Sequence, residues 1–176
     1  ATRWLGGLER SLSSSGALGA SVAMARSMCI LIGEGIRGEL SFDQAQEDAP
    51  TRIDGTIEGL TPGTHAIHIH TFGDFAQGLT SAGGIFNPFG KNHGAPDDEE
   101  RMVGDLGNIE VDAAGRCTVH IEDRLVKLIG PHSVIGRSVL IKQGEDDLGR
   151  GQHDLSLVNG NSGQRIAGGV VGIASS

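Results

Sequence analysis

Three histidines lie in the segment His65-Ala66-Ile67-His68-Ile69-His70, and the last two are separated by one residue. Residues two apart on a β-strand share a face, so His68 and His70 can direct their imidazoles toward one metal ion. Imidazole nitrogen is a common ligand of copper and zinc, which makes a transition-metal site one interpretation of this strand. Two surface imidazoles on a polar face are the other interpretation, and the spacing alone leaves both open.

The elements that must position these imidazoles are short β-prone segments separated by turn residues such as Thr61-Pro62-Gly63 and Gly130-Pro131. Eight segments at this pitch predict an all-β antiparallel sandwich or barrel. They are residues 29–32, 35–42, 51–57, 65–70, 107–111, 116–122, 138–142 and 168–173. Two long loops, 71–107 and 143–164, interrupt the pattern, and loops of that length are usually functional.

The charge balance limits the possible partners. There are 14 Lys+Arg against 22 Asp+Glu, which gives a formal net charge of −8 without a block of basic residues. Nucleic acids and anionic membranes attract basic patches, so we expect neither as the main partner. No stretch approaches the roughly 20 apolar residues that a membrane-spanning helix needs.

The two cysteines, Cys29 and Cys117, each lie in an apolar run. This context predicts small core residues, with a disulfide between them as the alternative. The chain has no Cys-x-Cys or Cys-x-x-Cys motif, which excludes thiolate zinc fingers.

Residues 1–26 differ in composition from residues 27–176, which we expect to form one domain. The first segment is rich in Arg and Ser, contains one acidic residue, and has Trp4, Leu5, Leu8 and Leu12 at helical spacing. It is interpreted as a short amphipathic helix, a transit peptide or the remnant of an upstream domain.

From about Cys29 to Ala174 the sequence resembles the copper/zinc superoxide dismutase family. The segments that carry the resemblance are His68-Ile69-His70-Thr71-Phe72-Gly73-Asp74, Thr80-Ser81-Ala82-Gly83-Gly84-Ile85-Phe86-Asn87-Pro88, His93-Gly94-Ala95-Pro96, Gly104-Asp105-Leu106-Gly107-Asn108, Ile135-Gly136-Arg137, Asp146-Asp147-Leu148-Gly149-Arg150-Gly151 and Gly160-Asn161-Ser162-Gly163-Gln164-Arg165. The resemblance implies an eight-stranded Greek-key β-barrel with a metal-binding loop, an electrostatic loop and a two-fold dimer. It also implies copper and zinc as cofactors.

Four ligand positions of the family are retained. The resemblance implies copper ligands at His68 and His70 and zinc ligands at His93 and Asp105. Two ligands rarely hold zinc in a closed tetrahedral site. Because the copper and the zinc site are both incomplete, we expect the binding of either metal to be weak or absent.

Three ligand positions have changed. Ile85 stands where the histidine that bridges copper and zinc is expected, Lys142 replaces a copper histidine, and Met102 replaces a zinc histidine. A hydrocarbon neither coordinates a metal nor carries a proton, and a lysine ammonium repels Cu²⁺. Met102 has two interpretations, a soft Cu(I) donor or a packing residue.

The residues around the ligands are partly kept. By resemblance, Asp146 links His68 to His93, and Arg165 guides an anion, with Lys142 as a second cation beside it. A loop-stapling network without any ligand is the alternative for Asp146 and Arg165. His65 either orients the metal strand or has a simple hydrogen-bonded structural role.

Leu79 and Gly168 stand where the family's intramolecular disulfide has its cysteines. We therefore expect hydrophobic packing of Leu79, Ile85 and Phe86 to anchor the metal-binding loop. His120 and His153 are expected on the solvent-facing surface.

Two classes of function follow from this ligand set. The first is a non-catalytic pseudoenzyme or interaction domain, which pairs with itself or with a superoxide dismutase. The dismutase-like central domain of the copper chaperone for superoxide dismutase is one such type. The second is a weak copper-dependent dismutase, an antioxidant enzyme that uses His68 and His70, with Arg165 guiding superoxide. The cysteine content favours the cytoplasm, and a transit peptide in residues 1–26 would instead direct the chain to mitochondria or plastids.

Overall fold

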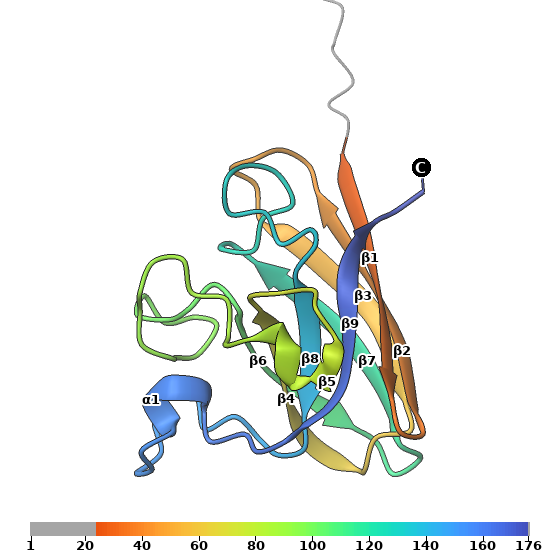
Figure 1. Cartoon of the computed structure of the whole chain (residues 1–176), viewed down its shortest axis with the longest axis vertical. Helices are drawn as coiled ribbons and strands as arrows, with labels where there is room; N and C mark the ends of the chain where they lie inside the picture. The colour runs from red at the N-terminus through yellow and green to blue at the C-terminus, as the bar shows by residue number, and fades with distance from the viewer. Residues whose placement is uncertain (1–23, 176) are drawn as a thin grey trace, which may run out of the picture.

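The computed structural model describes residues 24–175 of the chain. The first strand, β1, begins at Ala25 (Figure 1), close to the boundary that we predicted between residues 26 and 27. Ala25 and Arg26 pair with Gln44 and Asp43 of the neighbouring strand. The three interpretations of the preceding segment concern residues that lie outside the described part.

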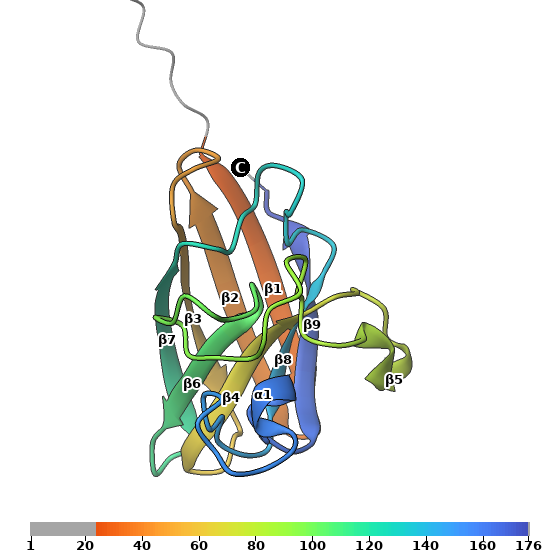
Figure 2. The ribbon, with the colours of Figure 1, turned by 90° about the vertical axis from the view of Figure 1, so that its left-hand side faces the viewer.

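Eight strands form one antiparallel sheet in the order β6-β4-β8-β9-β1-β2-β3-β7. They are β1 Ala25–Gly33, β2 Ile36–Gln44, β3 Thr51–Glu58, β4 Gly63–His70, β6 Asp105–Val111, β7 Arg116–Asp123, β8 Ser138–Lys142 and β9 Arg165–Ile173. The edge strands β6 and β7 lie next to each other, so the sheet curls into a nearly closed barrel (Figure 2). The predicted all-β fold with eight strands is confirmed.

Two connections give the barrel its crossovers. Strands β3 and β4 follow each other in the chain but are not hydrogen-bonded neighbours, and the same holds for β7 and β8. Since β4 pairs with both β6 and β8, these connections must pass over the ends of the barrel. This topology brings β4 and β8 together and places the two long loops, which follow them, on one region of the surface.

The core follows from the alternation of apolar residues along the strands. Every second residue of β2 from Ile36 to Gln44 is buried, including Leu40 and Phe42. Cys29 and Cys117 lie in the same apolar cluster and are both free thiols, which confirms them as small core residues.

Strands β4 and β8 are buried on both faces. Ile67, Ile69, Val139 and Ile141 belong to the barrel core. His68 is paired with Leu140 and His70 with Ser138, so these residues share the opposite face. Lys142, two residues after Leu140, lies on this face as well.

The two long loops cover that outer face (Figure 1). The first runs from residue 71 to residue 104 and contains β5 Ala76–Leu79 and the short helix η1 Thr80–Ala82. The second spans residues 143–164 and contains α1 Ser156–Asn159. Within residues 24–175, no helix is long and apolar enough to cross a membrane.

Candidate metal-site remnant

His68 and His70 lie side by side on the loop-covered face of β4, and both are buried. The centres of their rings are 6.3 Å apart. The Nε2 of His68 contacts the carboxylate of Asp146 at 2.8 Å, and the Nδ1 of His70 donates to the carbonyl of Gly83 at 2.8 Å. A carbonyl and an ionised carboxylate only accept hydrogen bonds, so each ring carries its proton on that nitrogen.

The other nitrogen of each ring is left with a lone pair. His68 Nδ1 and His70 Nε2 are two of the four buried polar side-chain atoms without a hydrogen-bond partner among the described residues. Burial, together with the cation of Lys142, lowers the pKa of His70 to about 2, and burial also lowers the pKa of His68 despite Asp146. Both rings are therefore neutral. The nitrogen of each ring that has no partner can accept a hydrogen bond or bind a metal.

Asp146 from the second loop bridges two imidazoles. Its Oδ2 contacts His68, and its Oδ1 contacts the Nε2 of His93 at 2.7 Å. Burial disfavours the carboxylate, but the bonds from the two rings outweigh this effect and hold the pKa of Asp146 well below its usual range. The two loops and strand β4 are thus joined at one buried anion.

His93 also contacts Asp105, the first residue of β6. The distance between His93 Nδ1 and Asp105 Oδ1 is 2.7 Å, so carboxylates face both nitrogens of the ring. Burial works against a charged ring, but the two carboxylates outweigh it and raise the pKa of His93 to about 9. At neutral pH the ring is an imidazolium with both nitrogens donating.

Ile85 and Lys142 both lie near His70. Ile85 pairs with His70 in an isolated antiparallel bridge, and residues opposed in such a bridge point to the same face. Lys142 is buried. Burial and the charge of Arg165 lower the pKa of Lys142 to about 8, although Asp146 opposes the shift.

Met102 is buried near the His93–Asp105 pair, and its backbone N–H donates to Asp105 Oδ2 at 2.8 Å. Asp105 Oδ2 also accepts from the backbone N–H of Gly94 at 3.1 Å. Met102, where the resemblance implies a zinc histidine, therefore contributes its backbone N–H to this cluster.

Arg165 points its guanidinium at the first loop. It donates to the carbonyls of Leu79 at 2.7 Å, of Thr80 at 3.3 Å and of Gly83. The same guanidinium borders an open pocket lined by Leu79, Thr80, Gly163, Gln164 and Arg165. Arg165 therefore holds the first loop at the edge of this pocket.

His65 is hydrogen-bonded within the barrel. Its Nδ1 lies 2.8 Å from the carbonyl of Lys142, and its Nε2 lies 2.9 Å from the carbonyl of Thr61. It fixes the end of β8, and through the backbone it helps to position Lys142. His120, paired with Asp54, and His153 are exposed, as predicted.

Three residues that support this cluster were missed at the level of sequence. Asn108 makes two hydrogen bonds with the backbone of Asp146, at 2.9 and 2.8 Å. Gly160, at a φ of 66°, leaves the space in which Asp146 meets His93. Buried Arg101 donates to the carbonyl of Asp105 and to the carboxylate of Asp123. The segment Gly104-Asp105-Leu106-Gly107-Asn108 was a signal for Asn108, but no local pattern indicates these long-range contacts.

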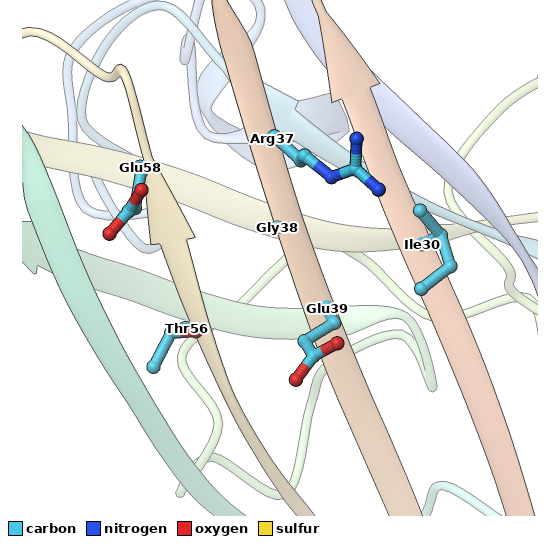
Figure 3. Close-up of a pocket in the computed structure, with 6 residues that line it drawn as sticks. All are labelled: Ile30, Arg37, Gly38, Glu39, Thr56 and Glu58. Atoms are coloured by element: carbon cyan, nitrogen blue, oxygen red, sulfur yellow. The ribbon is translucent and has the colours of Figure 1, made fainter.

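A separate depression lies on the outer face of β1, β2 and β3 (Figure 3). It is lined by Ile30, Arg37, Gly38, Glu39, Thr56 and Glu58. Glu58 is also 3.4 Å from Arg116 on β7. No buried titratable group converges on this depression, and the candidate site is the His–Asp cluster under the loops.

The side chains of this cluster do not supply a complete set of donors for copper or for zinc, the two metals that the family resemblance implies. For copper, His68 Nδ1 and His70 Nε2 are suitable donors, but Ile85 offers none, and Lys142 adds a cation beside Arg165. For zinc, one ligand atom each from His68, His93 and Asp105 lie within 4.8 Å of one another. However, the Nε2 of His68 is hydrogen-bonded to Asp146, and the Nδ1 of His93 is hydrogen-bonded to Asp105. A closed tetrahedral site needs four donors, so the residues present do not form one.

An eight-stranded Greek-key barrel with two paired histidines under two long loops defines the class of copper/zinc superoxide dismutases. The family model described as copper/zinc superoxide dismutase (SODC) matches residues 36–171. The chain is 50% identical to "Superoxide dismutase [Cu-Zn]" of Cordyceps militaris, over 154 residues that cover 86% of this chain and 100% of that protein. It is 49% identical to the protein of the same name from Talaromyces marneffei and 51% identical to the one from Claviceps purpurea (strain 20.1), with the same coverage.

The chain therefore belongs to the copper/zinc superoxide dismutase family, and it is a superoxide dismutase-like protein. Copper and zinc are the metals that this family implies, and its members are commonly dimers.

Proposed function

We propose that this chain is a pseudoenzyme, a superoxide dismutase-like interaction domain whose metal site has been eroded. The observation that carries the proposal is the position of Ile85, which pairs with His70 where the resemblance implies a histidine that bridges the metals. A hydrocarbon at this point removes one donor from each metal at once and removes a proton carrier. Lys142 and Met102 weaken the copper and the zinc positions further.

The partner that we propose is a second copy of this chain. An apolar face lies beside the first loop and consists of Ile30 and Ile32 of β1, Phe75, Leu79, and Val170 of β9. The side chains of Ile30, Ile32 and Val170 are 44%, 64% and 39% exposed, and no charged residue lines the groove between them. A subunit of another superoxide dismutase is the alternative partner for the same face.

Copper delivery, the role of the chaperone for superoxide dismutase, is not part of the proposal. Its transfer chemistry needs paired thiolates, and the two cysteines of this chain are both buried in the barrel, with the pKa of each raised by burial. The chaperone resemblance therefore extends to the interaction domain alone.

The test is to load the full chain with copper and zinc, measure both metals by elemental analysis and assay superoxide consumption on the same sample. We expect substoichiometric metal and no metal-dependent turnover. Near-stoichiometric copper with copper-dependent turnover would overturn the proposal.

A matched variant separates lost ligands from a changed pocket. The double substitution Ile85→His and Lys142→His restores the donors that the family pattern implies for copper, and adding Met102→His restores zinc. We expect the triple variant to take up both metals and to gain dismutase activity, because His68, His70, Asp146 and Arg165 are retained. An inactive, metal-free but folded triple variant would contradict the view that only the ligands were lost.

One observation favours a second function, a weak copper-dependent dismutase. The lone pairs of His68 Nδ1 and His70 Nε2 have no partner, and two imidazoles can bind copper by themselves. Arg165 would then guide the superoxide anion toward them. The names of the similar proteins point in the same direction, and the wild-type assay above decides between the two functions.

A further inference from the structure

Four buried side chains form a continuous chain between the two long loops. His68 of β4 contacts Asp146 of the second loop, Asp146 contacts His93 of the first loop, and His93 contacts Asp105 at the start of β6. All four residues are at most 2% exposed. Water competes little for these bonds, which makes the chain a strong connection between segments that are far apart in the sequence.

Both oxygens of each carboxylate in this series accept hydrogen bonds from the protein. Asp105 accepts His93 on Oδ1 and the backbone N–H groups of Gly94 and Met102 on Oδ2. Asp146 accepts His68 on Oδ2, and it accepts His93 and the backbone N–H of Leu148 on Oδ1. The anions are therefore satisfied by the protein alone.

His93 occupies the centre of this series of contacts, with a carboxylate oxygen 2.7 Å from each ring nitrogen. The two carboxylates belong to different segments, Asp105 at the start of β6 and Asp146 in the second loop, so one buried ring connects both of them to the first loop. Ile85 and Met102 supply no imidazole that would complete a four-donor zinc site around His93 and Asp105.

A second connection fixes the first loop to β9. A Cβ on Gly168 would lie 2.4 Å from the Cδ2 of Leu140 and 2.8 Å from the Cδ2 of Leu79, so Leu79 packs with Leu140 into the space that the glycine leaves open. Arg165 donates to the carbonyls of Leu79, Thr80 and Gly83 beside this contact. Leu79 and Gly168 are the positions at which the resemblance implies a disulfide, and both cysteines of the chain lie elsewhere as free thiols.

We propose that this chain reaches its folded state, with both long loops fixed, without a metal ion and without a disulfide. The His68–Asp146–His93–Asp105 chain substitutes for zinc, and the contact of Leu79 with Gly168 substitutes for the covalent bond. The apolar face beside Leu79 is then formed as soon as the chain folds, so partner docking needs neither metal supply nor oxidation. This last step rests on the proposed function, whereas the fixation of the loops does not.

The experiment is thermal unfolding and amide hydrogen exchange of the full chain after exhaustive chelation, with and without a reducing agent. The same measurements follow the addition of Zn²⁺ or Cu²⁺. We expect melting temperatures within about 1 °C of one another. We also expect unchanged protection at the amides of Gly94, Met102 and Leu148, which donate to the two carboxylates. Stabilisation by zinc of more than about 5 °C, or loss of this protection after chelation, would overturn the proposal.

A pair of variants tests the hydrogen-bonded series His68–Asp146–His93–Asp105. Asp146→Asn removes the anion between the two imidazoles, and we expect at least about tenfold faster exchange in residues 143–164, with β1, β2 and β3 unchanged. Asp154→Asn, an exposed residue of the same loop, is the control. Equal exchange in both variants would contradict the proposed role of Asp146. If Asp146→Asn does not fold, the chelation experiment on the wild type still decides.

The superoxide assay on the same samples keeps the two proposals separate. A protein that is active with copper and equally stable without metal would refute the pseudoenzyme and leave this inference standing. A protein that is inactive but loses the protection of its loop amides on chelation would refute this inference and leave the pseudoenzyme proposal standing.

Discussion

At the scale of single residues, burial of the charged Lys142 lowers the stability of the folded state. The residue is 3% exposed. Burial is the main reason why its pKa falls to about 8, and the attraction of Asp146 does not compensate for it. The folded state therefore disfavours the charged form of this residue.

We accordingly expect Lys142→Met to stabilise the protein. Methionine has a similar shape without the charge, so the free energy of unfolding at neutral pH should rise by about 1–3 kcal/mol. Urea denaturation measures this change. Lys91→Met, at an exposed site paired with Glu100, is the matched control and should have little effect. A loss of stability in Lys142→Met would mean that the ammonium is needed by its neighbours.

The thiol of Cys29 should be inert in the native protein. Burial raises its pKa to about 12, so the reactive thiolate is almost absent at neutral pH, and burial also raises the pKa of Cys117. We expect mass spectrometry to find no alkylation of the folded chain by iodoacetamide and two modified cysteines after unfolding. Rapid labelling of Cys29 before unfolding would show that β1 opens locally.

At the scale of elements, the second loop depends on a glycine. Gly160 follows α1 in the left-handed conformation, and a Cβ there would lie 1.8 Å from Asp146 Oδ1 and 2.7 Å from His93 Nε2. No side chain fits without breaking the bond between those two atoms. The conformation of one backbone position thus controls whether the loop connects to the first loop.

Gly160→Ala should therefore destabilise the protein by about 2–4 kcal/mol, from backbone strain plus the loss of the buried bond. Gly78→Ala separates the two contributions, because Gly78 has a similar φ of 70° with nothing within 4 Å of the added Cβ. We expect the control to cost only about 1 kcal/mol. Thermal and urea unfolding compare the pair, and equal losses would argue against a role for the Asp146–His93 bond.

The strands were largely predictable from the sequence, whereas the supporting contacts of the site were not. Alternation of apolar residues located the strands that include Leu40 and Ile53 to within a few residues, because one face of each is buried. The helices η1 and α1 and strand β5 are too short to show a period. The roles of Asn108 and Gly160 depend on residues more than ten positions away, which no local pattern encodes.

The ligand positions illustrate the same limit. The face shared by His68 and His70 follows from their spacing, but the partners of His93 came from resemblance alone. The sequence also gave no reason to expect that His93 and Asp105 bond directly to each other. That bond depends on the side chains that surround the pair, and Ile85 and Met102 are both buried in this region.

At the scale of the whole molecule, charge and shape favour association through the apolar face of Ile30, Ile32, Phe75, Leu79 and Val170. The chain has a formal net charge of −8, so two copies repel each other over most of their surfaces. The groove on this face has no charged lining residue. Burying it also removes the exposed side chain of Ile32 from water, which drives association.

We therefore expect the wild-type chain to sediment as a homodimer and Ile32→Lys to sediment as a monomer with an unchanged circular dichroism spectrum. A lysine at this position would carry its charge into the centre of the contact, at a cost of several kcal/mol if it has no partner. Leu157→Lys on α1 is the control, since Leu157 is 53% exposed and lies on the second loop, away from the groove. Sedimentation velocity across a range of concentrations gives the masses. A wild-type monomer would contradict the proposed dimer. A dimer that Leu157→Lys disrupts and Ile32→Lys does not would place the interface elsewhere, because a new charge weakens the dimer only when its side chain lies in the contact.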